Sequence, residues 1–273
     1  MIARRALLIV PLALAAGPAT AAPAAEPWPL WERHDAGASA TIDHAPWGRF
    51  LARFRRDAPD GIARVAYRAV AQADRAALEA EVTLLAGVPI SRFNRGEQFA
   101  FWVNLYNMLT VLTVLRRYPV ASIRDIAISP GWFSSGPWGA KLIEVEGTKL
   151  SLDDIEHRIL RPIWRDPRIH YVVNCAALGC PDLPVMPLTA ATTEAILEAA
   201  ARCYVNHPRG AAIESGRLVA SSIYVWYATD FGPDPVDTVR HLRRYARPDF
   251  YTALSYIRQV SADHYDWALN DAA

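Results

Sequence analysis

The sequence predicts a single helix-rich α+β domain in which a small sheet packs against a central buried helix. Residues 96–118 are apolar on almost every side, as expected of a helix at the centre of a core, and Pro119 ends the stretch. Short strand patterns lie among the helices without regular alternation, which favours α+β over a doubly wound sheet. No repeat or linker divides the chain after Pro29, so residues 44–273 are expected to form one domain.

Hydrophobic periodicity predicts further elements on both sides of the central helix. Helices are expected at 44–57, 73–86, 190–206, 222–230, 235–246 and 249–256. Strands are expected at 141–145 and 148–150, joined as a hairpin, at 168–174, at 217–220 and near 257–261. The 168–174 strand is predicted from an almost continuous apolar run. Ser151 and Asp154 have the spacing of a capping box that opens another helix.

The N-terminus has the three parts of a secretory signal peptide. Arg4 and Arg5 are followed by an apolar run at 6–16 and by the small-x-small sequence Ala-Thr-Ala at 19–21. The run is too short to span a membrane, which takes about 20 residues. Residues 1–21 are therefore predicted to be a cleaved leader, residues 22–43 an extension, and the mature protein periplasmic or secreted.

Composition and motifs exclude several classes of function. The net charge of +1 provides no field that would attract nucleic acid. Phosphate-binding glycine loops, GxSxG elbows, HExxH helices and calcium loops are absent from the sequence. No cofactor and no membrane span are predicted. A small-molecule or peptide ligand is compatible with the sequence, and the oligomeric state is not predicted.

Five ordered motifs resemble those of the domain of unknown function 547 family. They are FWVNLYN at 101–107, SLDDIEHRILR at 151–161, DPRIH with its NC and GCP continuation at 166–181, WYATDF at 226–231, and YDWALN at 265–270. Together they cover about residues 95–270. The resemblance implies an exported bacterial protein. It implies no particular reaction, because the family's name assigns none, although glutaredoxin-like fusions of some members hint at thiol chemistry.

Thiol, imidazole and carboxylate side chains gather within these motifs, at Glu156, His157, His170, Cys175 and Cys180. A cysteine is nucleophilic only as thiolate, which a nearby imidazole can provide. We therefore predict cysteine-dependent hydrolysis or acyl transfer, with either cysteine as nucleophile, either histidine as base and Glu156 as the orienting acid. In a continuous strand His170 and Cys175 would face opposite ways, so the hypothesis requires a bend near Asn174.

Other interpretations of the cluster remain open. Cys175 and Cys180 could instead form a structural disulfide, or exchange disulfides, although their spacing is looser than CxxC. Zinc binding is a weaker interpretation because the spacing is not that of a zinc knuckle, and no metal site is predicted. In a non-catalytic binding or scaffold domain, the groove would be lined by Trp132, Trp138 and Trp226, with Trp132 and Trp138 in a lid-like loop at 129–140.

Polar residues in the family motifs are candidates for binding the substrate. Asn104 and Asn107 lie one turn apart on the most apolar helix, where a buried amide needs partners. We expect them to bond the backbone of a neighbouring loop, and the alternative is that they hold a substrate carbonyl. Trp226 and Asp230, also one turn apart, and the adjacent pair Asp266 and Trp267 are the other candidates for the pocket wall.

Two further residue sets are predicted to be structural. Asp153 and Asp154 fall in the first turn of a helix, where the helix dipole and the cap explain them without catalysis. Cys203 is expected to be a buried small hydrophobe on the apolar side of a helix.

Overall fold

The helix α3 (Arg95–Leu115) lies at the centre of the computed structural model, which describes residues 22–131 and 135–272. All its residues from Glu97 onward are buried, and Asn94 caps it by accepting a hydrogen bond from the backbone N–H of Glu97. The helix is long and apolar enough to cross a membrane, but 94% of its most apolar stretch is buried within the protein. The prediction of a central buried helix is confirmed.

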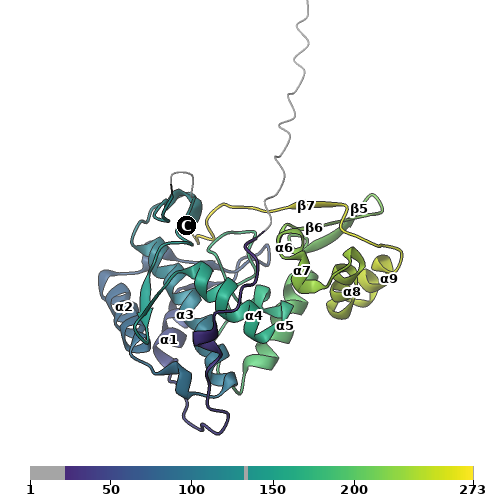
Figure 1. Cartoon of the computed structure of the whole chain (residues 1–273). Coiled ribbons are helices and arrows are strands. Elements are labelled where there is room, and N and C mark those ends of the chain that lie inside the picture. Colours follow the sequence, from purple (N-terminus) through teal and green to yellow (C-terminus); the bar gives the residue numbers. More distant parts are fainter. Residues whose placement is uncertain (1–21, 132–134, 273) are drawn as a thin grey trace, which may run out of the picture.

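The other helices follow along the chain (Figure 1). The longer ones are α1 (Ala45–Phe54), α2 (Gln72–Ala86), α5 (Thr193–Val205), α8 (Pro235–Tyr245) and α9 (Pro248–Leu254). Single turns are α4 (Arg161–Trp164), α6 (Ile223–Trp226), α7 (Ala228–Phe231), η1 (Pro29–Glu32), η2 (Tyr67–Ala69), η3 (Ile90–Arg92), η4 (Ile123–Asp125) and η6 (Pro167–Tyr171). The segment η5 (Asp154–Leu160) is π-helical.

The strands of the described residues form small separate sheets, which confirms the helix-rich α+β class. Antiparallel pairs are made by β1 (Arg55–Arg56) with β2 (Arg64–Val65) and by β3 (Ile143–Val145) with β4 (Thr148–Leu150). The third sheet has the order β5 (Ala211–Glu214), β6 (Arg217–Ser221) and β7 (Ala262–His264), with β6 and β7 parallel.

Two hydrophobic clusters make up the core. The larger cluster packs around α3 and includes Trp47, Trp102 and Ile155. The smaller cluster lies between α5, α8 and β6 and includes Tyr204 and Leu242. Figure 1 shows α1–α3 on one side of the molecule and α6–α9 on the other, with α4 and α5 between them. The C-terminal segment joins both sides, because β7 pairs with β6 while Val65 and Asn270 pair near the end of the chain.

Several local predictions were wrong. The predicted strand at 168–174 is instead the short helix η6, because Asp166 caps a turn that Pro167 begins. The predicted helix at 222–230 divides into α6 and α7, and the last strand lies at 262–264 rather than 257–261. Strand β5 was not predicted. Cys203 is exposed, because α5 buries the face that carries Leu197 and Ala201 instead. The predicted leader 1–21 and Trp132 lie outside the described residues.

Candidate functional site

A cavity of about 1160 Å³ opens between the two hydrophobic clusters. Tyr106 and Val173 of the larger cluster and Ile223 of the smaller cluster lie in its lining, together with Trp226, which packs on the smaller cluster. Pockets for small ligands typically measure roughly 300–1,000 Å³ and lie where two packed units meet. The cavity is therefore large enough to enclose a small organic molecule.

One side of the cavity is an aromatic wall. It consists of Trp138, Trp226, Tyr265 and Trp267, all of them half-buried. Tyr227 also lines the cavity, but its ring packs on His170, with the ring centroids 4.0 Å apart. The ring centroids of Tyr265 and Trp267 lie 4.7 Å apart, those of Trp226 and Tyr265 4.8 Å, and those of Trp138 and Trp267 5.7 Å. The rings pack against one another at tilted or edge-on angles, while part of each side chain remains open.

The acidic and imidazole side of the cavity is built on η5. Glu156 and His157 belong to this π-helical segment, and Asp153 precedes it. Single π-helical turns are rare in proteins, and those that occur are often found at functional sites. Asp154 faces away from the cavity and completes the predicted capping box, because its backbone N–H donates to Ser151 Oγ at 3.1 Å and its Oδ2 accepts from the Ser151 N–H at 2.8 Å. Only one of the two neighbouring aspartates is therefore in the site.

Six ionisable side chains form a continuous series of contacts, called the acid–imidazole chain below. Its order is Asp153, His157, Arg161, Asp230, His170 and Glu156. Arg161 Nη1 donates to His157 Nδ1 at 3.1 Å, and because arginine has no acceptor, the proton of a neutral His157 lies on Nε2. Burial and the charge of Arg161 lower the pKa of His157, although Glu156 acts to raise it. His157 Nε2 then faces Asp153 Oδ1 at 3.6 Å.

The middle of the acid–imidazole chain is a buried ion pair. Arg161 binds Asp230 through two bonds, of 2.6 Å from Nε and 2.9 Å from Nη2, and His170 Nε2 lies 2.7 Å from Asp230 Oδ2. Although burial acts to raise it, the pKa of Asp230 lies well below its usual value because of the hydrogen bonds from His170 and Arg161. The other ring nitrogen of His170 lies 3.8 Å from Glu156 Oε1.

The two carboxylates that line the cavity have opposite pKa shifts. Burial and the charges of Glu156 and Asp154 raise the pKa of Asp153 to about 6. Burial also acts to raise the pKa of Glu156, but the two histidines and hydrogen bonds from tyrosines outweigh it and hold this pKa below its usual value. One of these bonds is donated to Glu156 Oε2 by the Tyr106 hydroxyl, at 3.0 Å. Near pH 6, Glu156 is therefore ionised while Asp153 is partly protonated.

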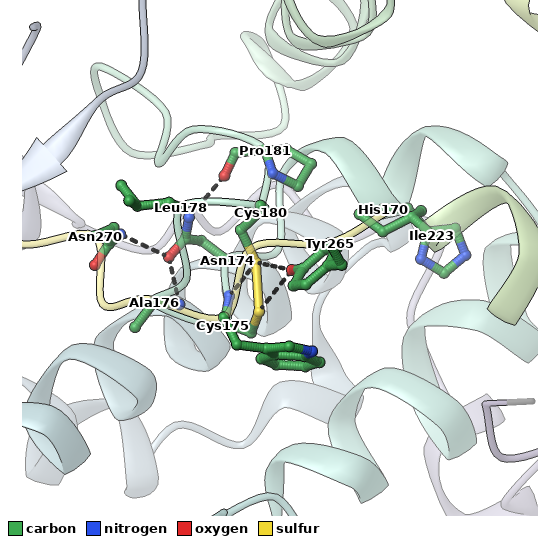
Figure 2. The surroundings of a disulfide bond; sticks show 12 residues. His170, Asn174, Cys175, Ala176, Leu178, Cys180, Pro181, Ile223, Tyr265 and Asn270 are labelled. Atoms are coloured by element: carbon green, nitrogen blue, oxygen red, sulfur yellow. Dashed lines mark hydrogen bonds between the residues drawn. A yellow bond between two sulfur atoms is a disulfide. The ribbon is translucent and has the colours of Figure 1, made fainter. Parts of the chain in front are cut away.

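Cys175 and Cys180 lie at disulfide distance, with their Cα atoms 6.3 Å apart (Figure 2). Both line the cavity. The backbone N–H of Cys175 donates to Cys180 Sγ at 3.0 Å, and the Tyr265 hydroxyl lies 3.0 Å from Cys180 Sγ and 3.1 Å from Cys175 Sγ. Figure 2 shows His170 beside Ile223, on the far side of Tyr265 from the sulfur atoms.

The two asparagines of α3 bind backbone, as the favoured interpretation of the sequence holds. Asn104 Oδ1 accepts from the N–H of Leu188 at 3.0 Å, and its Nδ2 donates to the carbonyl of the same residue at 2.8 Å. Asn107 Nδ2 donates to the Val172 carbonyl at 2.8 Å and its Oδ1 accepts from the Asn174 N–H at 2.9 Å. Neither residue is in the cavity lining.

Asn174 continues this bracing into the cysteine loop. Its Nδ2 donates to the Pro181 carbonyl at 2.6 Å, and its Oδ1 accepts from the Ala176 N–H at 2.8 Å and from Asn270 Nδ2 at 3.3 Å (Figure 2). These bonds hold Ala176 at a φ of +61°, a left-handed backbone conformation that residues other than glycine rarely adopt. The loop that carries both cysteines is thus fixed by asparagine side chains as well as by the sulfur atoms.

The structure brings some of the predicted site residues together and not others. The cavity lining includes Cys175, Cys180, His170, His157, Glu156 and Trp226. Asp230 does not line the cavity but contacts His170, which does. Asp266 is exposed, and its Oδ1 accepts a hydrogen bond from the Ala268 N–H. Sequence reasoning missed the cavity positions of Asp153, Tyr227 and Tyr265. The last two lie in the quoted motifs WYATDF and YDWALN, so the motifs already contained the signal.

Nothing in the described part of the chain resembles a metal centre, since it has no group of three or more His, Cys, Asp or Glu side chains placed to hold an ion. Residues 90–205 match the model of a family described as a protein of unknown function, DUF547. The match contains the motifs at 101–107, 151–161 and 166–181, and it confirms the resemblance over that segment. No curated protein and no solved structure matches the chain.

Replacing Asp230 by asparagine should destabilise the fold in a pH-dependent way. It leaves Arg161, whose side chain is 3% exposed, without its carboxylate, so we expect urea denaturation at pH 7 to show a loss of about 3–5 kcal/mol. Because the folded pKa of Asp230 is depressed, the stabilisation is fully present above the unfolded value of about 3.9 and is lost progressively as the pH falls from that value through the lower folded pKa. The difference between Asp230→Asn and the parent should shrink near pH 3.

Asp57→Asn is the matched control, because Asp57 is 81% exposed and pairs with Arg55 at the surface. Its loss should stay below about 1 kcal/mol. Equal losses for the two variants would contradict a buried role for Asp230.

Proposed function

The chain belongs to the DUF547 family through residues 90–205, and we propose that it is a hydrolase that acts on a small ligand enclosed in the cavity. The observation that supports this best is the pair Asp153 and Glu156, two carboxylates of one cavity whose pKa values are shifted in opposite directions. Such a pair is the usual arrangement of a general acid beside a general base.

In this proposal each member of the acid–imidazole chain has one role. Asp153 gives a proton to the leaving group, and Glu156 takes a proton from the attacking water. His157 donates from Nε2, because Arg161 occupies its other ring nitrogen. His170 and Asp230 are positioning residues, since His170 is held between Asp230 and Glu156 by contacts of 2.7 and 3.8 Å.

Cysteine-dependent hydrolysis or acyl transfer is the version in which Cys175 or Cys180 supplies the nucleophile. In the structure the two sulfur atoms are paired with each other, and the two ring nitrogens of His170 face Asp230 and Glu156. The cysteine sulfur atoms and the His170 ring nitrogens therefore have other partners, and they do not form a cysteine–histidine pair. These contacts favour the acid–base version.

Thiol–disulfide exchange is a second candidate function, supported by the surroundings of Cys180. An attacking substrate thiolate would form a mixed disulfide with Cys175, the more exposed of the two, and Cys180 would leave as thiolate. The Cys175 N–H and the Tyr265 hydroxyl, both 3.0 Å from Cys180 Sγ, would stabilise that charge. A second substrate thiolate would release the oxidised substrate, and a disulfide-bearing partner would regenerate the pair.

We also propose that the protein is exported and cleaved after Ala21. The proposal is supported by the position of the next residues, because Ala22 and Pro23 form part of the cavity lining. The Ala22 N–H donates to the Trp226 carbonyl at 3.2 Å, and the Pro23 carbonyl accepts from Arg161 Nη1 at 2.6 Å. A disulfide also suits an oxidising compartment.

Hydrolysis of a panel of nitrophenyl esters, amides and glycosides tests the acid–base proposal. Asp153→Asn and Glu156→Gln should each lower kcat about 10²–10⁴-fold. Activity requires protonated Asp153 and ionised Glu156, so the parent's rate should fall as the pH rises above about 6, and Asp153→Asn should lose this alkaline limb. Asp154→Asn is the matched control, since Asp154 caps a helix outside the cavity, and it should keep the parent's pH profile.

Loss of activity in Cys175→Ser and Cys180→Ser, with Asp153→Asn and Glu156→Gln unaffected, would favour the cysteine version instead. If none of the panel is hydrolysed, the non-catalytic binding domain becomes the better hypothesis.

Redox titration in glutathione buffers, followed by alkylation and mass spectrometry, tests the exchange function. Tyr265→Phe removes a donor to Cys180 Sγ, so the dithiol form should be less stable and the reduction potential more negative, by on the order of 30 mV. Tyr251→Phe, at an exposed tyrosine of α9, should leave the potential unchanged. A pair that stays oxidised in millimolar dithiothreitol would exclude exchange.

Mass spectrometry of the protein exported by a bacterial host should find a chain that begins at Ala22. Ala21→Trp removes the small residue at the cleavage point, so the uncleaved form should accumulate. An intact full-length chain in the cytoplasmic fraction of the parent would contradict export.

A further inference from the structure

The aromatic wall and the carboxylates that line the same cavity suggest a chemical class for the ligand. We propose that the cavity binds a saccharide, with the apolar face of a sugar ring against the aromatic wall and its hydroxyl groups toward Asp153, Glu156 and His157. The ligand class rests on the lining alone, whereas cleavage of a glycosidic bond rests also on the proposed hydrolase function.

The aromatic wall supplies the flat apolar surface that this ligand requires. Trp138, Trp226 and Tyr265 are each half-buried, although large aromatic side chains in a soluble protein are mostly covered unless they meet a partner. Their unburied parts lie in the lining of one concave cavity and not on scattered surface positions. A sugar ring presents C–H groups on its faces, which pack on an aromatic face without requiring hydrogen bonds.

The carboxylates and the imidazole of the lining supply several hydrogen-bonding groups, and a ligand with many hydroxyl groups can bind all of them. Glu156 and Asp153 are acceptors, and His157 Nε2 is a donor whose tautomer is fixed by Arg161. A purely apolar ligand would offer no hydrogen bonds to the Asp153 carboxylate or to His157 Nε2, and covering polar groups without replacing their hydrogen bonds to water is costly. Hydroxyl groups can both donate to the carboxylates and accept from the imidazole.

Charged ligands fit the lining less well. A multiply anionic ligand would meet the carboxylates of Asp153, Glu156 and Asp263. A cation would be attracted to the aromatic faces, but the protein's own cations already lie over two of them. The guanidinium of Arg124 is 5.2 Å from the centroid of Trp267, and that of Arg161 is 4.9 Å from the centroid of Tyr227. The remaining faces suit a neutral ligand.

The proposed acid–base pair is also the pair of groups that glycoside hydrolysis needs. The proton of Asp153 passes to the glycosidic oxygen as its bond to the anomeric carbon breaks. Water forms the new bond to that carbon and gives one proton to Glu156. Exchange with solvent then returns Glu156 to carboxylate and Asp153 to the acid. The balance needs only water and the saccharide, and the cavity of about 1160 Å³ has room for more than one sugar ring.

Titration of tryptophan fluorescence with neutral tetrasaccharides tests the ligand class. Maltotetraose, cellotetraose, xylotetraose and chitotetraose are titrated into the Glu156→Gln protein, in which turnover is blocked. At least one should bind saturably. Trp226→Ala, made in the same background, should weaken this binding at least tenfold, and Trp226→Tyr should restore part of it because an aromatic face is regained. Trp164→Phe, in α4 and outside the cavity lining, is the control and should bind like the Glu156→Gln protein.

Unchanged melting temperatures show that the variants are folded. If none of the four tetrasaccharides binds at millimolar concentration, or if binding is unaffected by Trp226→Ala, the saccharide inference is overturned. Ester hydrolysis that depends on Asp153 and Glu156 without sugar binding would leave the hydrolase proposal standing and remove only the ligand class. Sugar binding to the parent without release of shorter sugars would support the ligand class and count against the hydrolase.

Discussion

The pairing of Asp230 with Arg161 and His170 is the interaction on which the cavity depends. Asp230 lies in α7, beside the smaller cluster, whereas Arg161 and His170 lie in α4 and η6. Because a buried guanidinium without its carboxylate is costly, the two sides of the cavity cannot separate without losing this contact. The same carboxylate holds the imidazole that faces Glu156 and the guanidinium that fixes the tautomer of His157. One ion pair thus connects the two walls and fixes the tautomer of His157.

A second constraint is the asparagine bracing of the cysteine loop. Asn107, Asn174 and Asn270 bind its backbone or one another, so the loop has fixed geometry apart from the sulfur atoms. A disulfide between residues five positions apart closes a short loop, which constrains the unfolded chain little. The cysteine pair therefore contributes little to the stability of the fold through the entropy of the unfolded chain.

Neighbouring residues in this chain have very different environments. Asp154 is bound by Ser151 and Lys141 and its pKa is lowered, whereas Asp153 faces the cavity and its pKa is raised. Trp226 and Tyr227 show the same division, since both line the cavity but only Tyr227 packs on His170. Membership of the site is therefore decided residue by residue, because neighbours within one sequence motif can have different environments.

The sequence by itself determined the α+β class, the central helix α3, the β3–β4 hairpin, the capping box at Ser151 and the family resemblance over residues 90–205, because these depend on local periodicity and short spacings. Only the tertiary structure decided that Asp153 belongs to the site and Asn104 does not, that 168–171 is helical, and that Cys203 is exposed. These outcomes depend on contacts between residues far apart in the chain, such as His170 with Asp230 and Cys180 with Tyr265, 60 and 85 positions away. Periodicity reports which face of an element is buried, but it carries no information about the partner that buries it.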